Sequence, residues 1–275
     1  MAELVGGFLV PHVPLITANP TTPPLEKRKT VMDAFATVNR RLNELKVDTV
    51  VIIGDDHYTI FGPQCVPRCL IGIGTVEGPV EPWVNIPRRP VQNDTGLAEH
   101  IMQTGFDNDV DWAVSKTLTL DHSVMLPYHL AVSPSSHMKI VPIYQSCAVE
   151  PLISSRRIRK IGAITGDAIR SYPSNTRVAI LGTGGLSHWV GMARMGDVNE
   201  EWDQKVIELV RKGDIDALIA REEMATIEAA GNGALEIKNW IFAMAALGKT
   251  QPELIAYAPV PEWVTGCAFM ELKVA

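Results

Sequence analysis

The amino-acid sequence predicts an α/β fold, a single-domain sandwich in which a central mixed sheet is flanked by helices. Apolar, β-branched runs alternate with segments of helical periodicity, which is the order expected of such a sandwich. At 46% hydrophobic residues the chain can bury a full core. No internal repeat, low-complexity tract or linker divides it, so we expect one domain over residues 1–275.

The first elements are predicted as strand, helix and strand. Residues 5–10 are an apolar strand that leads into His12. A proline-rich stretch then precedes a helix over residues 25–45, where apolar side chains recur at helical spacing. Residues 48–54 form a continuous apolar, β-branched run that ends in Asp55-Asp56-His57. Such a run is typical of a strand covered by helices on both faces.

The alternation continues less regularly towards the C-terminus. Further strands are predicted over residues 69–76, 110–114, 139–144 and 177–181. Further helices are predicted over residues 96–104, 155–171, 199–211 and 234–247. The proline-rich segment 78–89 is predicted to cross the surface.

Charge and composition exclude some partners. Lys and Arg total 25 against 31 for Asp and Glu, so the basic footprint of a nucleic-acid-binding protein is missing. The N-terminal segment lacks the positive flank of a signal peptide, and no run approaches the ~20 apolar residues of a membrane span. We therefore expect a cytoplasmic protein that binds neither nucleic acid nor membrane. Its four cysteines are expected to be free thiols.

Three histidines share one kind of position. His12 and His57 each follow the C-terminal end of a predicted strand, and His188 follows the strand at 177–181 after a glycine-rich turn. Ligands bind at that edge of open α/β sheets. Structural roles are expected for His100, inside a predicted helix, and His137, in a Ser/Pro loop.

The turn before His188 is not a dinucleotide loop. A GxGxxG pattern would need glycine where Ser187 stands. We expect instead that the turn, including Thr183 and Gly184, brings backbone close to a ligand and offers N–H groups to an anionic oxygen.

A carboxylate would complete a metal site with His12 and His57. Two histidines and one carboxylate form the facial triad of non-haem iron(II) oxygenases. Glu236 follows a Gly-Asn-Gly turn, where the backbone conformation is special, but periodicity alone does not separate it from Glu222, Glu223 or Glu228.

Five motifs together resemble a known family. They are Pro11-His12, Gly54-Asp-Asp-His57, Asp121-His122-Ser, the string GTGGLSH ending at His188, and GNGALE ending at Glu236. In this order, spanning nearly the whole chain, they look like the catalytic subunit of class III extradiol dioxygenases, the protocatechuate 4,5-dioxygenase and gallate dioxygenase type.

The resemblance implies roles for individual residues. His12, His57 and Glu236 would bind Fe(II), His188 would be the acid/base residue beside the substrate, and His122 would lie next to the metal ligands and take part in catalysis. Two regions are expected to contact the substrate. They are the segment with His129, and the region around Trp189 and residues 261–265.

The resemblance also implies the reaction. Both atoms of O₂ would enter a dihydroxylated aromatic or pyridine ring and open it to a muconic semialdehyde-type acid. Protocatechuate, gallate, an O-methylgallate and a dihydroxypyridine all remain candidate substrates, and the regiochemistry stays open. We expect a homo-oligomer, with a separate small subunit as the alternative. The rival hypotheses are a zinc-dependent member of the same fold and a non-catalytic scaffold.

Overall fold

A mixed sheet runs through the whole molecule. The structure is a computed structural model that describes residues 1–135 and 137–274. Within them the sheet has nine strands. These are β1 (Glu3–Val10), β2 (Thr49–Asp55), β3 (Cys69–Gly78), β4 (Arg89–Val91), β5 (Ala113–Thr119), β6 (Lys139–Gln145), β7 (Arg177–Thr183), β8 (Thr250–Val260) and β9 (Thr265–Val274).

The centre of the sheet is parallel, and its outer pairs are antiparallel except for the parallel pair of β3 and β5. The strand order is β4-β3-β6-β2-β7-β1-β9-β8, with β5 paired to β3. Strands β6, β2, β7 and β1 run parallel to one another, whereas β9 and β8 on one side and β3 on the other add antiparallel pairs. The C-terminal ends of β1, β2 and β7 therefore meet at one edge.

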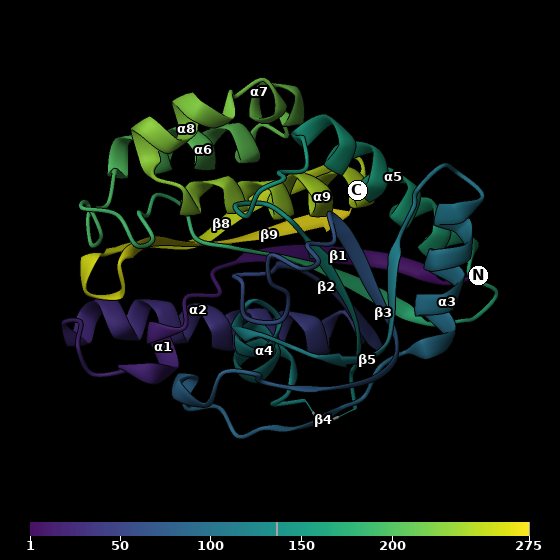
Figure 1. The fold of residues 1–275 in the computed structure, drawn as a ribbon. Helices are drawn as coiled ribbons and strands as arrows, with labels where there is room; N and C mark the ends of the chain where they lie inside the picture. The colour runs from purple at the N-terminus through teal and green to yellow at the C-terminus, as the bar shows by residue number, and fades with distance from the viewer. Residues whose placement is uncertain (136, 275) are drawn as a thin grey trace.

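Helices cover both faces of this sheet (Figure 1). The helices are α1 (Leu15–Ala18), α2 (Leu25–Glu44), α3 (Thr95–Phe106), α4 (His122–Pro127), α5 (Ser155–Ser171), α6 (Glu200–Arg211), α7 (Ile215–Ile219), α8 (Glu223–Ala230) and α9 (Ile237–Leu247). Helices α5 and α9 lie on one face, under α6, α7 and α8, and α2 and α4 lie on the other. The single-domain α/β sandwich is confirmed. None of the described helices is long and apolar enough to cross a membrane.

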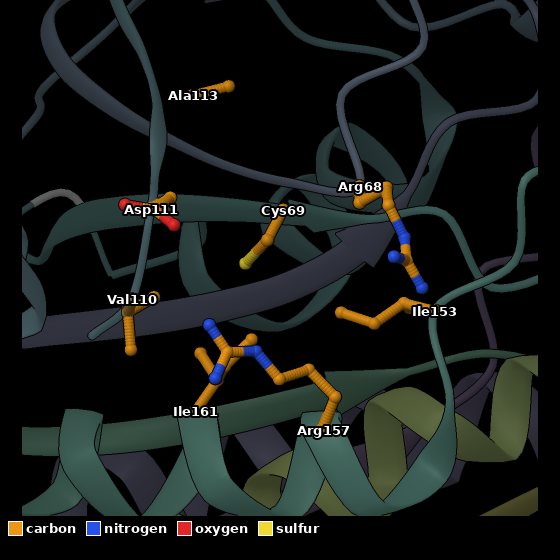
Figure 2. A pocket seen from close by; sticks show the side chains of 8 residues that line it. All are labelled: Arg68, Cys69, Val110, Asp111, Ala113, Ile153, Arg157 and Ile161. Atoms are coloured by element: carbon orange, nitrogen blue, oxygen red, sulfur yellow. The ribbon is translucent and has the colours of Figure 1, made fainter. Parts of the chain in front are cut away.

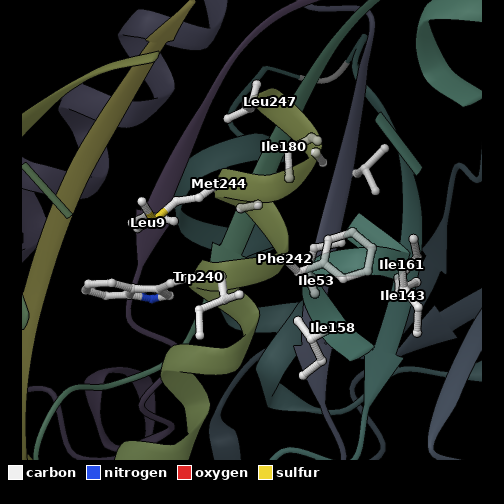
Figure 3. Close-up of a cluster of buried hydrophobic side chains, with 14 of the residues drawn as sticks. Leu9, Ile53, Ile143, Ile158, Ile161, Ile180, Trp240, Phe242, Met244 and Leu247 are labelled. Carbon is white, nitrogen blue, oxygen red and sulfur yellow. The ribbon is translucent and has the colours of Figure 1, made fainter. Parts of the chain in front are cut away.

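Helix α9 is buried along nearly its whole length, and Glu236 directly precedes it. Nearly every residue from Ile237 to Leu247 is buried, as expected of a helix that is apolar all round. Its side chains interlock with those of α5 and of the central strands (Figure 3). Close packing against α5 needs Gly166, because a Cβ there would lie 2.0 Å from the Ala246 carbonyl oxygen.

The sequence predicted most elements but missed the C-terminal hairpin. No strand was expected beyond residue 247, yet β8 and β9 pair along their whole length. Pro252 and Pro259 interrupt the β8 pattern, and proline is tolerated there because β8 is an edge strand. The strand expected at 110–114 is displaced to Ala113–Thr119, and residues 233–236 form a 3₁₀ turn before α9.

Candidate active site and metal centre

Three parallel strands deliver the three strand-end histidines to one edge of the sheet. Strand β1 ends at Val10, β2 at Asp55 and β7 at Thr183, and His12, His57 and His188 follow shortly after. Because β7 pairs with both β1 and β2, these chain ends lie side by side. All three side chains line the same cavity.

Hydrogen bonds to Nδ1 orient His12 and His57. Nδ1 of His57 lies 3.1 Å from Asp121 Oδ2, and because an ionised carboxylate only accepts, Nδ1 carries the proton. Nδ1 of His12 lies 2.9 Å from the Thr183 hydroxyl, which has carbonyl oxygens at 2.9 and 3.0 Å for its own proton. The Thr183 oxygen therefore accepts from His12. When these rings are neutral, the form in which histidine binds a metal, the lone pair of each is on Nε2.

Glu236 lies between these two Nε2 atoms. One carboxylate oxygen is 3.3 Å from His12 Nε2 and the other is 3.4 Å from His57 Nε2. The backbone N–H of Gly185 donates to Oε2 at 2.7 Å, so the glycine-rich turn holds the carboxylate. Burial raises the pKa of Glu236, but His12 and His188 outweigh burial and lower it well below its usual range. Glu236 is thus an anion at neutral pH.

The site attracts positive charge. Burial lowers the pKa of His57, yet Asp55, Asp121 and Glu236 together raise it well above its usual value. No Lys or Arg of the described chain lines the cavity or pairs with Glu236. Lone pairs on Nε2 would face carboxylate oxygens unless a proton or a cation lay between them. A divalent cation satisfies several of these contacts at once.

The donor set fits a metal ion. Ligand atoms of His12, Asp55, His57 and Glu236 all lie within 4.8 Å of one another. Nε2 of His12 is buried and makes no hydrogen bond within the described residues. Two imidazoles with a carboxylate are the ligands of a facial-triad centre, which leaves positions open for other ligands. The structure brings together the three residues that the sequence suggested as ligands.

His188 lies beside this group. Its Nδ1 donates to the Leu186 carbonyl at 2.9 Å, and its Nε2 lies 3.3 Å from Glu236 Oε1. Burial lowers the pKa of His188, but Glu236 outweighs burial and raises it. The ring packs on Gly233, where a Cβ would lie 2.0 Å from Nε2. The Gly-Asn-Gly turn therefore has a packing role as well as a conformational one.

His122 packs against the two histidines of the same group. Its ring centroid is 4.3 Å from that of His57, and its Nδ1 is 2.6 Å from Glu81 Oε1. Burial, followed by the charge of His57, lowers the pKa of His122 despite the contact with Glu81. Glu81 comes from the proline-rich segment, so this excursion reaches the site and does not only cross the surface.

A cavity of about 300 Å³ opens in front of these residues. Much of its wall is apolar, from Val13, Pro14, Leu15, Trp83, Val190 and Met195. Hydroxyl groups of Thr59 and Thr265 supply the polar part beyond the histidines and Glu236.

The other expected substrate contacts do not reach this cavity. Thr183 is fully buried, and its hydroxyl already accepts a hydrogen bond from His12. Gly184 packs against the Glu236 side chain. Trp189 is buried beneath Arg194, whose guanidinium lies 3.9 Å from the ring centroid. His129 belongs to the turn at 128–132 and is also outside the wall. Within the segment expected at 261–265, Val264 and Thr265 do line the cavity.

Several residues near the site received no role from the sequence. Asp121 and Glu81 orient histidines, and Asp55 and Asn239 lie beneath the ligands. For Asp55 a usable signal existed, because it ends the same strand that precedes His57. For Glu81, 41 residues from His122, there was none.

A second hollow lies elsewhere (Figure 2). It has about 250 Å³ and is lined by residues in or just before β3, β5 and α5, including Arg68, Cys69 and Arg157. It contains one carboxylate, from Asp111, and no histidine. It therefore lacks the donors of a metal centre of this kind.

Known proteins resemble the chain along its whole length. A 2,3-dihydroxyphenylpropionate/2,3-dihydroxicinnamic acid 1,2-dioxygenase of Photorhabdus laumondii is 25% identical, with 95% of each chain covered. A relative with the same description from Burkholderia vietnamiensis is 24% identical, with 85% of this chain and 86% of the relative covered. The crystal structure of an uncharacterized protein of Escherichia coli K12 superimposes with a TM-score of 0.65 at 8% identity, covering 97% and 99% of the two chains, and shares the fold.

A family match agrees with the arrangement of the site. Residues 6–268 match the family described as the catalytic LigB subunit of aromatic ring-opening dioxygenase. That range includes every residue of the candidate metal centre. The chain belongs to this family and is a ring-cleaving dioxygenase.

Proposed function

We propose that the chain is an Fe(II)-dependent extradiol dioxygenase in which His12, His57 and Glu236 hold the ion. One observation carries this proposal. The Nε2 atoms of His12 and His57 lie 3.3 and 3.4 Å from the buried carboxylate of Glu236, and the cavity wall contains no Lys or Arg. We further propose that residues 1–275 act as one catalytic domain. A homo-oligomeric assembly and a cytoplasmic location stay predictions.

The protein's own side chains would carry out the proton transfers of the reaction. A ferrous ion at this site would supply adjacent positions for the two oxygens of a vicinal diol, lower their pKa and provide a position for O₂. His188 donates a hydrogen bond from Nδ1 to the Leu186 carbonyl, so in the neutral ring Nε2 can accept a diol proton from the cavity. The resulting imidazolium can return a proton to an oxygen during ring opening. His122, which Glu81 orients, can take part in catalysis at another position of the substrate ring.

The substrate we propose is a single ring with two adjacent hydroxyl groups. The relatives named above are described as acting on 2,3-dihydroxyphenylpropionate and the corresponding cinnamic acid. A cavity of about 300 Å³ accommodates one such ring with a short substituent. Both oxygen atoms of O₂ would enter the product, a ring-opened semialdehyde acid.

The test is anaerobic reconstitution with Fe(II), followed by O₂ uptake with a panel of catechols, catecholic acids and dihydroxypyridines. We expect iron-dependent uptake that Glu236→Ala abolishes together with iron binding. His188→Ala should retain iron but turn over at least about 100-fold more slowly, as expected for loss of an acid/base group. Activity with Zn(II) but not Fe(II), or failure of the protein to bind iron, would refute the proposal.

A further inference from the structure

Asp55 lies beneath the candidate metal ligands with one oxygen unused. It is the last residue of β2, and its side chain is fully buried. Oδ1 accepts a hydrogen bond from Asn239 Nδ2 at 2.8 Å. Oδ2 makes no hydrogen bond within the described residues. A buried carboxylate oxygen without a partner costs free energy unless a cation or a donor approaches it.

The free side of this carboxylate faces the candidate ligands. Asp55 Oδ2 is 3.6 Å from His57 Nε2, and Oδ1 is 4.0 Å from His12 Nε2. Donor atoms that share one ion at about 2.1 Å lie roughly 3 to 4 Å apart. The distance from the free oxygen Oδ2 to His57 meets this condition, and the other distance shows that the carboxylate also lies close to His12.

A direct hydrogen bond does not explain the contact. Asp55 Oδ2 and His57 Nε2 lie 3.6 Å apart, too far for a hydrogen bond. In the neutral form that binds metals, His57 keeps its proton on Nδ1, towards Asp121, so its Nε2 presents a lone pair to Asp55. No Lys or Arg forms an ion pair with Asp55 among the described residues. The carboxylate and the imidazole nitrogens therefore need a shared positive charge.

We propose that Asp55 is a fourth protein donor to the metal ion in the substrate-free enzyme, together with His12, His57 and Glu236. This inference rests on the proposed metal centre and extends it. Two carboxylates and two neutral imidazoles would balance the charge of a divalent ion in this buried site. Asn239 positions the group by holding Oδ1, which leaves Oδ2 free for the ion.

Removal of the Asp55 charge should keep or raise the melting temperature of the metal-free protein but lower its affinity for the metal. Without metal, Asp55→Asn relieves a buried charge that repels Glu236, so the melting temperature should stay equal or rise. With metal, the variant should bind more weakly by at least about tenfold. A purely structural role for Asp55 would lower the melting temperature of the metal-free protein.

The experiment is titration of the full-length, metal-free protein with Co(II), followed by calorimetry and by the visible absorption of the bound ion. Asp55→Asn and Asp55→Ala are compared with wild type, after circular dichroism has shown that they fold. The matched control is Asp94→Asn, a buried aspartate that accepts from Thr49 at the other end of β2. We expect weaker Co(II) binding and an altered spectrum in both Asp55 variants, and wild-type binding in the control.

The outcomes separate this inference from the proposed function. If both Asp55 variants bind Co(II) as tightly as wild type while His12→Ala does not bind it, Asp55 is not a donor and the three-residue centre stands. A lowered melting temperature without loss of affinity would also overturn the inference. If wild type binds no Co(II), or if His12→Ala binds it unchanged, both the inference and the proposed centre are wrong.

Discussion

The hydroxyl of Thr183 holds His12 in place, and its removal should weaken both folding and metal binding. Thr183 Oγ1 lies 2.9 Å from His12 Nδ1, 2.9 Å from the Ile53 carbonyl and 3.0 Å from the Ser123 carbonyl. Thr183→Val keeps the shape but leaves a buried N–H without an acceptor, which costs about 1 to 3 kcal/mol. The lost hydrogen bond to a carbonyl adds about 1 kcal/mol. We therefore expect the free energy of unfolding to fall by about 2 to 4 kcal/mol.

A second threonine offers a matched control. Thr165 is also fully buried, but its hydroxyl has no hydrogen-bond partner in the described residues. Thr165→Val should therefore leave stability unchanged or raise it. Urea unfolding of the metal-free proteins measures both, and calorimetry with Co(II) should show a loss of about 10- to 100-fold in affinity for Thr183→Val alone. Equal stability and equal affinity of the two variants would refute the role given to Thr183.

Three further predictions concern catalysis, substrate and pH. Glu81→Gln, which removes the charge beside His122, should lower kcat by about tenfold or more with little change in KM. Steady-state O₂ uptake measures both constants, and a change in KM alone would contradict the prediction. An alkylcatechol should have a kcat/KM at least about tenfold above that of the catechol with a carboxylate at the same ring position. The reason is that the cavity wall contains no Lys or Arg to pair with the carboxylate. Equal values in parallel assays would contradict this prediction. Burial raises the pKa of Asp203 to about 6, despite hydrogen bonds from Tyr257 and Ser187 that lower it. The folded state therefore holds this proton more tightly than the unfolded state, so the free energy of unfolding should fall by up to about 3 kcal/mol as pH rises from 4 to 6. Asp203→Asn should lack that part of the pH dependence in urea titrations, and identical slopes for variant and wild type would exclude it.

The central strands and the long helices were predictable because their signals are local. The β-branched run at the core of β2 is typical of a buried strand, and α2 and α5 show helical periodicity along their whole length. The β8–β9 hairpin was not predictable in this way. Its edge strand alternates irregularly and contains Pro252 and Pro259, and pairing with β9 determines its conformation.

By itself, the sequence determined that histidines follow the ends of β1, β2 and β7, since a strand and the residue after it are neighbours in the chain. Local patterns did not identify which acidic residues join them, and only the resemblance to the extradiol dioxygenases implied Glu236. Only the tertiary structure decided that Glu236 and Asp55 face the same two imidazoles and that Glu81 orients His122. It also decided that Val264 and Thr265 line the cavity while Trp189 does not. These contacts join residues far apart in the chain, and their distances depend on the order and register of the strands, which no local pattern encodes.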